Sequence, residues 1–387
     1  MGVAASPGLS LACLAAPESD LKATIRSLSD ESRAKLVAAL WNLDLRVHGQ
    51  PPAVMTATCV CDQKADLGEG PLWDRRRDRL LWIDVLGAKL YEFDPVSKSN
   101  RVMDLSMHTA NVTTVVPCQN SKSLVVVGVS EGFALYDLDT GDFKPHPSNP
   151  VHRLNEQQPA YKAGEPELGG ETMARMNDGR CDPTGRLWCG SLVRDGKRDI
   201  IMGAGALYTL DSWDADVKFA MGNISVSNGM AWHEGTMYYT DSPSFGVDAM
   251  SWSPDSSPSS IVSSRRQAFK VAESFPPVPD GCALDSEGKL WITLFGAGAV
   301  KRIDPVTREV LAVVKLPEEA GLESTACAFG GPGQTELYIA TAREYWEEDD
   351  ERNKKHPKAG GLFKVSSEQL GGITGVPAYF FAYNDKN

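Results

Sequence analysis

Four short motifs in this sequence place an oxygen-bearing side chain beside a glycine: Glu69-Gly70-Pro71, Asn177-Asp178-Gly179, Asn228-Gly229-Met230 and Asp280-Gly281-Cys282. Carboxylate and amide side chains offer hard oxygen donors and neither sulfur nor imidazole. A site that gathers them would suit Ca²⁺, Mg²⁺ or Mn²⁺, and Zn²⁺ could also bind there, with water completing the coordination shell. Two carboxylates would neutralise one divalent ion. An open, hydrated shell is typical of a catalytic metal rather than a structural one.

A single Asn-Gly or Asp-Gly pair is most often a turn. These four motifs, however, share one register, because each precedes a Trp- or Tyr-containing strand-like run by about ten residues. Recurrence in the same register favours one shared site over four separate turns. We therefore predict that the four motifs converge.

The elements that must position the motifs are short runs rich in Trp, Tyr, Val and Ile, separated by Gly, Asp, Asn and Pro. Six such runs, each followed by a second run, share one hairpin plan: 79–84 with 89–95, 123–127 with 134–137, 186–189 with 206–210, 236–240 with 247–251, 289–293 with 300–305, and 336–340 with 361–365. Repeats of this kind predict an all-β, six-bladed β-propeller, since each four-stranded unit packs on its neighbours and ring closure protects the sheet edges. The motifs would then lie on the innermost strands, at one mouth of the central channel.

The first 55 residues follow a different pattern. We predict an N-terminal extension over 1–55 and the propeller over 56–387. Ser29 can cap a helix, and an apolar stripe at helical spacing follows it, at Leu36, Val37, Leu40, Trp41 and Leu43. This amphipathic helix either packs against the main domain or serves as a docking or dimerisation element, and its partner is open. Gly2 and Ser6 fit the loose pattern for N-terminal acylation, but no polybasic segment follows.

Composition excludes several classes of function. The net charge of −12 argues against a nucleic-acid partner, and no apolar run approaches the roughly 20 residues of a membrane span. The eight cysteines have no CxxC spacing, and no basic residue precedes the apolar stretch 9–16, so we predict a cytoplasmic protein rather than a secreted one. The sequence also lacks GxSxG, P-loop and HExxH motifs. The acidic cluster 347–351 is predicted to be a solvated loop in the last blade.

Five phrases, in this order, resemble the signatures of the senescence marker protein, regucalcin and gluconolactonase family: 67–73 (LGEGPLW), 175–179 (RMNDG), 227–230 (SNGM), 279–281 (PDG) and 327–331 (CAFGG). The resemblance covers about residues 60 to 365. It implies a six-bladed propeller that holds one divalent cation and hydrolyses a sugar lactone to the aldonic acid.

The resemblance also implies roles for individual residues. Glu69, Asn228 and Asp280 would be the metal ligands, and Asp280 would in addition activate water as a general base. Arg175 and Asn177 match positions that contact the lactone. Asp195 stands where the family often carries a glutamate that helps to bind substrate.

Two alternatives stay open. The same oxygens could belong to a non-catalytic calcium-binding regulatory protein of the regucalcin type, or to a related propeller esterase or phosphotriesterase. Arg175 and Asn177 favour an enzyme, because calcium binding alone needs neither. The polar segments 149–171 and 194–205 depart from the family pattern, and loops at a propeller mouth decide which substrate fits. The lactone, the physiological metal and the oligomeric state therefore remain open.

Overall fold

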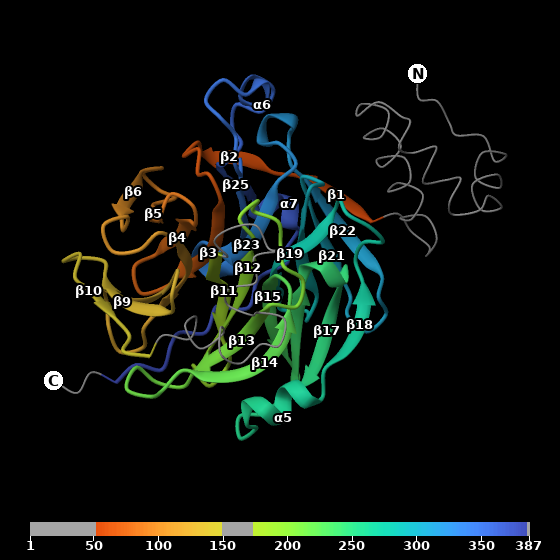
Figure 1. The fold of residues 1–387 in the computed structure, drawn as a ribbon. Helices are drawn as coiled ribbons and strands as arrows, with labels where there is room; N and C mark the ends of the chain where they lie inside the picture. Colours follow the sequence, from red (N-terminus) through yellow and green to blue (C-terminus); the bar gives the residue numbers. More distant parts are fainter. Residues whose placement is uncertain (1–51, 149–172, 385–387) are drawn as a thin grey trace, which may run out of the picture. The chain divides into compact units, whose positions relative to one another are not determined.

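Six sheets surround a central channel in the computed structural model, which describes residues 52–148 and 173–384 (Figure 1). The predicted six-bladed propeller is confirmed. Blades 1 to 3 consist of β3 (Gly68–Asp74), β4 (Arg79–Asp84), β5 (Lys89–Phe93) and β6 (Asn100–Asp104); β7 (Val112–Pro117), β8 (Leu124–Val129), β9 (Phe133–Asp137) and β10 (Phe143–Pro145); and β11 (Met173–Cys181), β12 (Leu187–Arg194), β13 (Gly205–Leu210) and β14 (Lys218–Ile224).

The other three blades repeat the plan with one addition. They consist of β15 (Ser227–His233), β16 (Thr236–Asp241), β17 (Gly246–Ser251) and β18 (Arg266–Lys270); β19 (Val278–Leu284), β20 (Leu290–Phe295), β21 (Ala299–Ile303) and β22 (Val310–Lys315); and β23 (Ser324–Gly330), β24 (Glu336–Thr341) and β25 (Leu362–Val365) with β2 (Thr58–Cys61). Because β2 pairs antiparallel with β25, strands from both ends of the described chain build blade 6 and close the ring.

The addition is β1 (Ala53–Thr56), which pairs parallel with β22 at the outer edge of blade 5. The predicted boundary between residues 55 and 56 falls inside this strand. The predicted N-terminal helix, the acylation pattern at Gly2 and the segment 149–171 lie outside the described residues.

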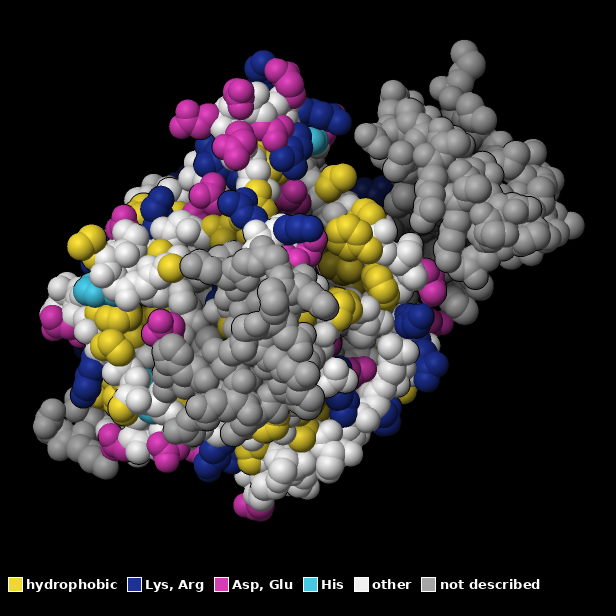
Figure 2. Space-filling view, in the orientation of Figure 1, with side chains coloured by type: hydrophobic (Ala, Val, Ile, Leu, Met, Phe, Trp, Pro, Cys, Tyr) yellow, Lys and Arg dark blue, Asp and Glu magenta, His cyan; other side chains and the backbone are white. Residues whose placement is uncertain are grey.

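Helices are few in the described part of the chain: α5 (Pro258–Ser263), α6 (Glu351–Lys355) and α7 (Ser367–Leu370). Within those residues, no helix is long and apolar enough to cross a membrane. The acidic cluster 347–351 lies between β24 and β25, where Asp350 caps α6. Figure 2 shows acidic side chains gathered around that helix.

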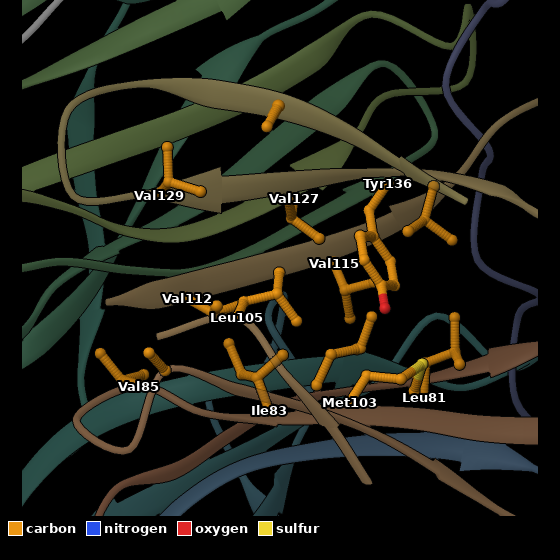
Figure 3. Packing of buried hydrophobic residues seen from close by; sticks show 14 of the residues in the cluster. Leu81, Ile83, Val85, Met103, Leu105, Val112, Val115, Val127, Val129 and Tyr136 are labelled. Carbon is orange, nitrogen blue, oxygen red and sulfur yellow. The ribbon is translucent and has the colours of Figure 1, made fainter. Parts of the chain in front are cut away.

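The core lies between the blades, and the two faces of one strand show how it forms. Leu81 and Ile83 of β4 pack with Val115 and Val127 of blade 2 (Figure 3), while Leu80 and Trp82 pack with blade 6. Alternate residues of a strand point to opposite faces, so a strand that is buried on both faces reads as a continuous apolar run. This is why the hairpins are so prominent in the sequence.

The C-terminal segment 373–383 crosses the end of the channel at which the innermost strands finish. The backbone N–H of Val376 donates to Leu284 O of blade 5 (3.0 Å), and that of Ala382 donates to Gly185 O of blade 3 (2.9 Å). Between them, Arg75 of blade 1 donates to Ala378 O (2.7 Å). The segment thus crosses this end and helps to line an open cavity of about 80 Å³ together with Arg180, Cys282 and Cys327.

Candidate functional site

The four motifs lie on the innermost strands β3, β11, β15 and β19, where each strand has an irregularity. The antiparallel register shifts between Glu69 and Leu72, between Met176 and Gly179, between Asn228 and Met230, and between Pro279 and Cys282. A bulge of this kind re-aims side chains that a regular strand would direct between the blades. The shared register predicted from sequence is thus a shared backbone irregularity, at the end of the channel opposite to segment 373–383.

The glycines of two motifs serve as spacers between strands. A Cβ on Gly229 would lie 2.8 Å from Asp280 O, and a Cβ on Gly281 would lie 2.6 Å from Ala326 Cβ. Both glycines lie inside strands, and neither has a positive φ. They therefore allow neighbouring innermost strands to approach closely, and the turn interpretation of these two dipeptides is wrong.

Hydrogen bonds join three of the predicted site residues. Arg175 Nη1 donates to Asn177 Oδ1 (2.6 Å), and Asn177 Nδ2 donates to Asn228 Oδ1 (2.9 Å) and to Ser227 O (2.7 Å). Asn228 Nδ2 in turn donates to Ser242 Oγ (2.7 Å). These bonds fix the orientation of both amides, so that Asn228 Oδ1 keeps one lone pair for a further ligand.

Three carboxylates, of Glu69, Asp178 and Asp280, influence one another's ionisation in the same part of the channel. Burial, followed by the neighbouring charge of Asp178, raises the pKa of Glu69 to about 8. Burial also raises the pKa of Asp280 well above its usual range, and the charges of Glu69 and Asp178 add to the effect. Asp178 is 5% exposed; one of its oxygens accepts the Gly179 N–H (2.8 Å), and the other has no hydrogen-bond partner. The two nearby guanidinium groups, of Arg175 and Arg180, would leave one negative charge in excess if all three carboxylates were ionised.

This donor set fits a divalent cation. Glu69 and Asp280 disfavour each other's ionised form, and a bound cation would remove that cost. Among the described residues, no three His, Cys, Asp or Glu side chains are grouped so that they could hold a metal ion. The predicted ligands are instead two carboxylates and the Asn228 amide, all oxygen donors of the kind that Ca²⁺ and Mg²⁺ prefer.

These carboxylates predict how the stability of the cation-free protein depends on pH. The pKa of Glu69 rises from 4.5 to about 8 on folding, so between these values the unfolded chain has lost a proton that the folded protein keeps. The free energy of unfolding should then fall as pH rises through this range, by an amount on the order of a few kcal/mol. Urea denaturation of chelator-treated protein at several pH values checks this. An added divalent cation should weaken the dependence, and stability that does not change with pH would contradict the prediction.

Comparison with known proteins identifies the family. Residues 67–343, more than half of the chain, match the SMP-30/Gluconolactonase/LRE-like region. The chain belongs to the SMP-30/gluconolactonase/LRE-like family. The resemblance found in the motifs is thereby confirmed.

Relatives in this family match along nearly their whole length. Bacillus subtilis (strain 168) YvrE, named as a candidate sugar lactone lactonase, is 33% identical over 325 residues, which cover 84% of this chain and 98% of YvrE. Regucalcin of Danio rerio is 33% identical over 326 residues, which cover 84% of this chain and 97% of the relative. Among solved structures, a regucalcin of Agrobacterium tumefaciens, described as a calcium-binding protein, has a TM-score of 0.67 at 22% identity, covering 86% of this chain and 99% of that one. The last comparison shows the shared fold.

Two further residues of this family member reach the site without any motif in the sequence. Glu344 lies just after β24 and pairs with Arg194 at the end of β12 (Nη2 to Oε1, 3.0 Å). The charge of Glu344 also contributes to the raised pKa of Asp280. The pKa of Arg175 is lowered to about 10 by burial and by Arg194, and Glu344 and Tyr345 oppose this shift. Both residues therefore lie close to the predicted substrate-binding arginine.

The same contacts form a bridge across the mouth of the channel. Blades 3 and 6 are opposite each other in the ring, and the Arg194–Glu344 pair joins them. Beside it, the Arg198 guanidinium lies 4.4 Å from the centre of the Tyr345 ring. We call these four residues the mouth bridge. Only the folded ring brings its two ends together, because they are about 150 positions apart in the sequence.

Asp195 lies next to the mouth bridge, in the turn that follows β12. Its Oδ1 accepts the backbone N–H groups of Lys197 (2.8 Å) and Asp199 (2.9 Å). One carboxylate oxygen therefore holds the turn together, as is common for aspartate at such positions. That Asp195 also contacts substrate stays a prediction.

Proposed function

We propose that this protein hydrolyses a lactone to the corresponding hydroxy acid in a reaction that requires one divalent cation. A sugar lactone that yields an aldonic acid is the substrate predicted from the family motifs. The observation that carries the proposal is the Arg175–Asn177–Asn228 chain of hydrogen bonds beside the buried carboxylates of Asp178 and Asp280. A site that only binds a cation does not require an oriented guanidinium. A lactone carbonyl or hydroxyl group, in contrast, can accept a charge-assisted hydrogen bond from it.

The proposed ligands are Glu69, Asn228 and Asp280. A divalent cation bound there would polarise the lactone carbonyl and offset the negative charge that develops on its oxygen. Asp280, as a carboxylate, accepts a proton from the attacking water, the new C–O bond forms, and the ring C–O bond breaks. Asp280 then returns this proton to the ring oxygen, which leaves as a hydroxyl group, so one lactone and one water give one hydroxy acid. Arg175 and Asn177 orient the ring for this attack.

The test is a pH-indicator assay of gluconolactone with chelator-treated protein, corrected for spontaneous hydrolysis. Turnover should fall to the spontaneous rate and return when Ca²⁺, Mg²⁺, Mn²⁺ or Zn²⁺ is added, because removing the cation leaves the carbonyl unpolarised. The turnover restored by each ion would rank the four ions as cofactors. Turnover that survives complete removal of metal would disprove the metal dependence.

One comparison favours a second candidate, a non-catalytic calcium-binding protein. Several relatives are named regucalcin, and the Agrobacterium tumefaciens structure is described as calcium-binding. In that case calorimetry would detect Ca²⁺ binding to the full chain, while a panel of lactones, esters and phosphotriesters would show no turnover with any of the four ions.

A further inference from the structure

The loops at the candidate-site end of the channel expose large hydrophobic side chains. Ten such side chains are exposed in the described residues, and five of them lie in loops at this end: Met107, Met202, Phe275, Leu322 and Tyr345. At the opposite end there are two, Val96 and Val306, both in hairpin turns. Scattered exposed apolar residues are normal on a protein surface, but a concentration of them beside a candidate site indicates binding.

Three of the five lie on neighbouring loops of blades 5 and 6, and we call them the apolar rim: Phe275, Leu322 and Tyr345. They are 67%, 55% and 39% exposed, respectively. Figure 2 shows hydrophobic side chains exposed over β21 and β22 on this face, beside basic and acidic side chains. Phe275 and Tyr345 are the larger aromatic groups, so most of the apolar surface of the rim is aromatic.

The backbone holds the apolar rim in place. The carbonyl of Leu322 accepts the N–H groups of Gly296 (2.9 Å) and Gly298 (2.8 Å) in the β20–β21 hairpin. Pro276, next to Phe275, packs against the same hairpin, since a Cβ on Gly296 would lie 2.8 Å from Pro276 Cβ. Two rim residues therefore flank one hairpin. A preorganised apolar surface binds with a smaller loss of conformational entropy than a mobile one.

Contacts link two rim residues to the candidate site. Tyr345 belongs to the mouth bridge, and it opposes the lowering of the pKa of Arg175. Leu322 is followed by Glu323, which accepts the N–H of Glu344 (3.1 Å). Phe275 comes five residues before Asp280 on the chain segment that enters β19. A ligand whose ring lies at Arg175 and Asn177 could therefore reach the rim.

We infer that the substrate is a lactone whose ring carries an apolar alkyl or aryl substituent, with the substituent lying on Phe275, Leu322 and Tyr345. The inference rests on the proposed lactone hydrolysis, and it replaces the sugar lactone that the family motifs predict with a more apolar substrate. Phe275 and Leu322 carry no side-chain hydrogen-bonding group, so a polyhydroxylated substituent would lose water there without replacement bonds. An alkyl chain would instead bury apolar surface on both sides of the contact.

The test compares two lactones with the same six-membered ring, δ-valerolactone and δ-decalactone, the second of which adds a pentyl chain. The full-length protein is assayed with the divalent cation that gives the highest turnover. We expect kcat/KM to be about tenfold higher for δ-decalactone, at the lower end of what apolar contacts give in a closed pocket. Phe275→Ser and Leu322→Ser should each lower this ratio about threefold or more. Val306→Ser, an 82% exposed residue at the opposite end, should leave the ratio unchanged.

Equal kcat/KM for the two lactones would overturn the inference while leaving the proposed hydrolysis intact. The same holds if both rim variants keep the wild-type ratio. Absence of turnover with both lactones and with gluconolactone would overturn the proposed function, and the inference with it.

Discussion

Asp280→Asn is expected to lower kcat/KM for lactone hydrolysis by about 10³-fold or more. The substitution removes both the proposed general base and one of the two anionic ligands that we propose for the cation. General base catalysis alone typically contributes about 10²–10⁴-fold. Asparagine keeps the size of the side chain and one oxygen, so packing in the channel is retained. The measurement is the pH-indicator assay under saturating cation, together with calorimetric titration of the cation.

The stability of this variant gives an independent result. In the cation-free protein, the ionised Asp280 carboxylate is disfavoured by burial and by Glu69 and Asp178. The neutral amide of Asp280→Asn should therefore leave the thermal midpoint without cation unchanged or higher, and should reduce the increase that the cation produces. Asp255→Asn, an exposed aspartate in the turn before α5, is the matched control and should behave as wild type. Wild-type turnover by purified Asp280→Asn protein would refute the proposed mechanism.

Arg175→Met is expected to lower kcat/KM by about 10²-fold while cation affinity stays the same or increases. Arg175 is 8% exposed, and its guanidinium is oriented by the Asn177 amide, so it can donate a charge-assisted hydrogen bond to the lactone. The same positive charge opposes a cation held by Glu69, so its removal should not weaken binding of the cation. Steady-state kinetics and calorimetry on one preparation separate the two effects.

This variant distinguishes the proposed lactonase from a protein that only binds calcium. Arg266→Met, at an exposed position of β18, is the matched control and should change neither quantity. Loss of cation affinity in parallel with activity would instead mean that Arg175 supports the cation site, and that its role in binding the lactone is wrong.

Much of the fold could be predicted from the sequence because propeller blades leave a strong local pattern. In Arg79–Asp84, for example, β4 is buried on both faces, so its hydrophobic run is continuous and recognisable. The recurring pair of a polar residue and a glycine could also be predicted, because the same local requirement repeats in several blades. Innermost strands meet their neighbours at the channel, and Gly229 and Gly281 allow the backbones to approach closely there.

Other features could not be predicted, because they depend on residues that lie far apart in the sequence. Glu344 has no motif around it and reaches the site only because blade 6 stands opposite blade 3 in the ring. Strand β2 is a second example, because its partner β25 lies about 300 residues further along the chain. Asp195 shows the reverse case. Its position in the sequence suggested a role in binding substrate, but one of its carboxylate oxygens accepts two backbone hydrogen bonds within its own turn.

The blade repeat, the ring of innermost strands and the oxygen-rich motifs can be predicted from local sequence, since each depends on side chains within a few residues of one another. The charge balance of Glu69, Asp178 and Asp280, the mouth bridge and the apolar rim arise only when the chain folds. Desolvation and charge-charge interactions depend on distance through space, and closing a six-bladed ring sets those distances between residues that the chain separates by more than a hundred positions.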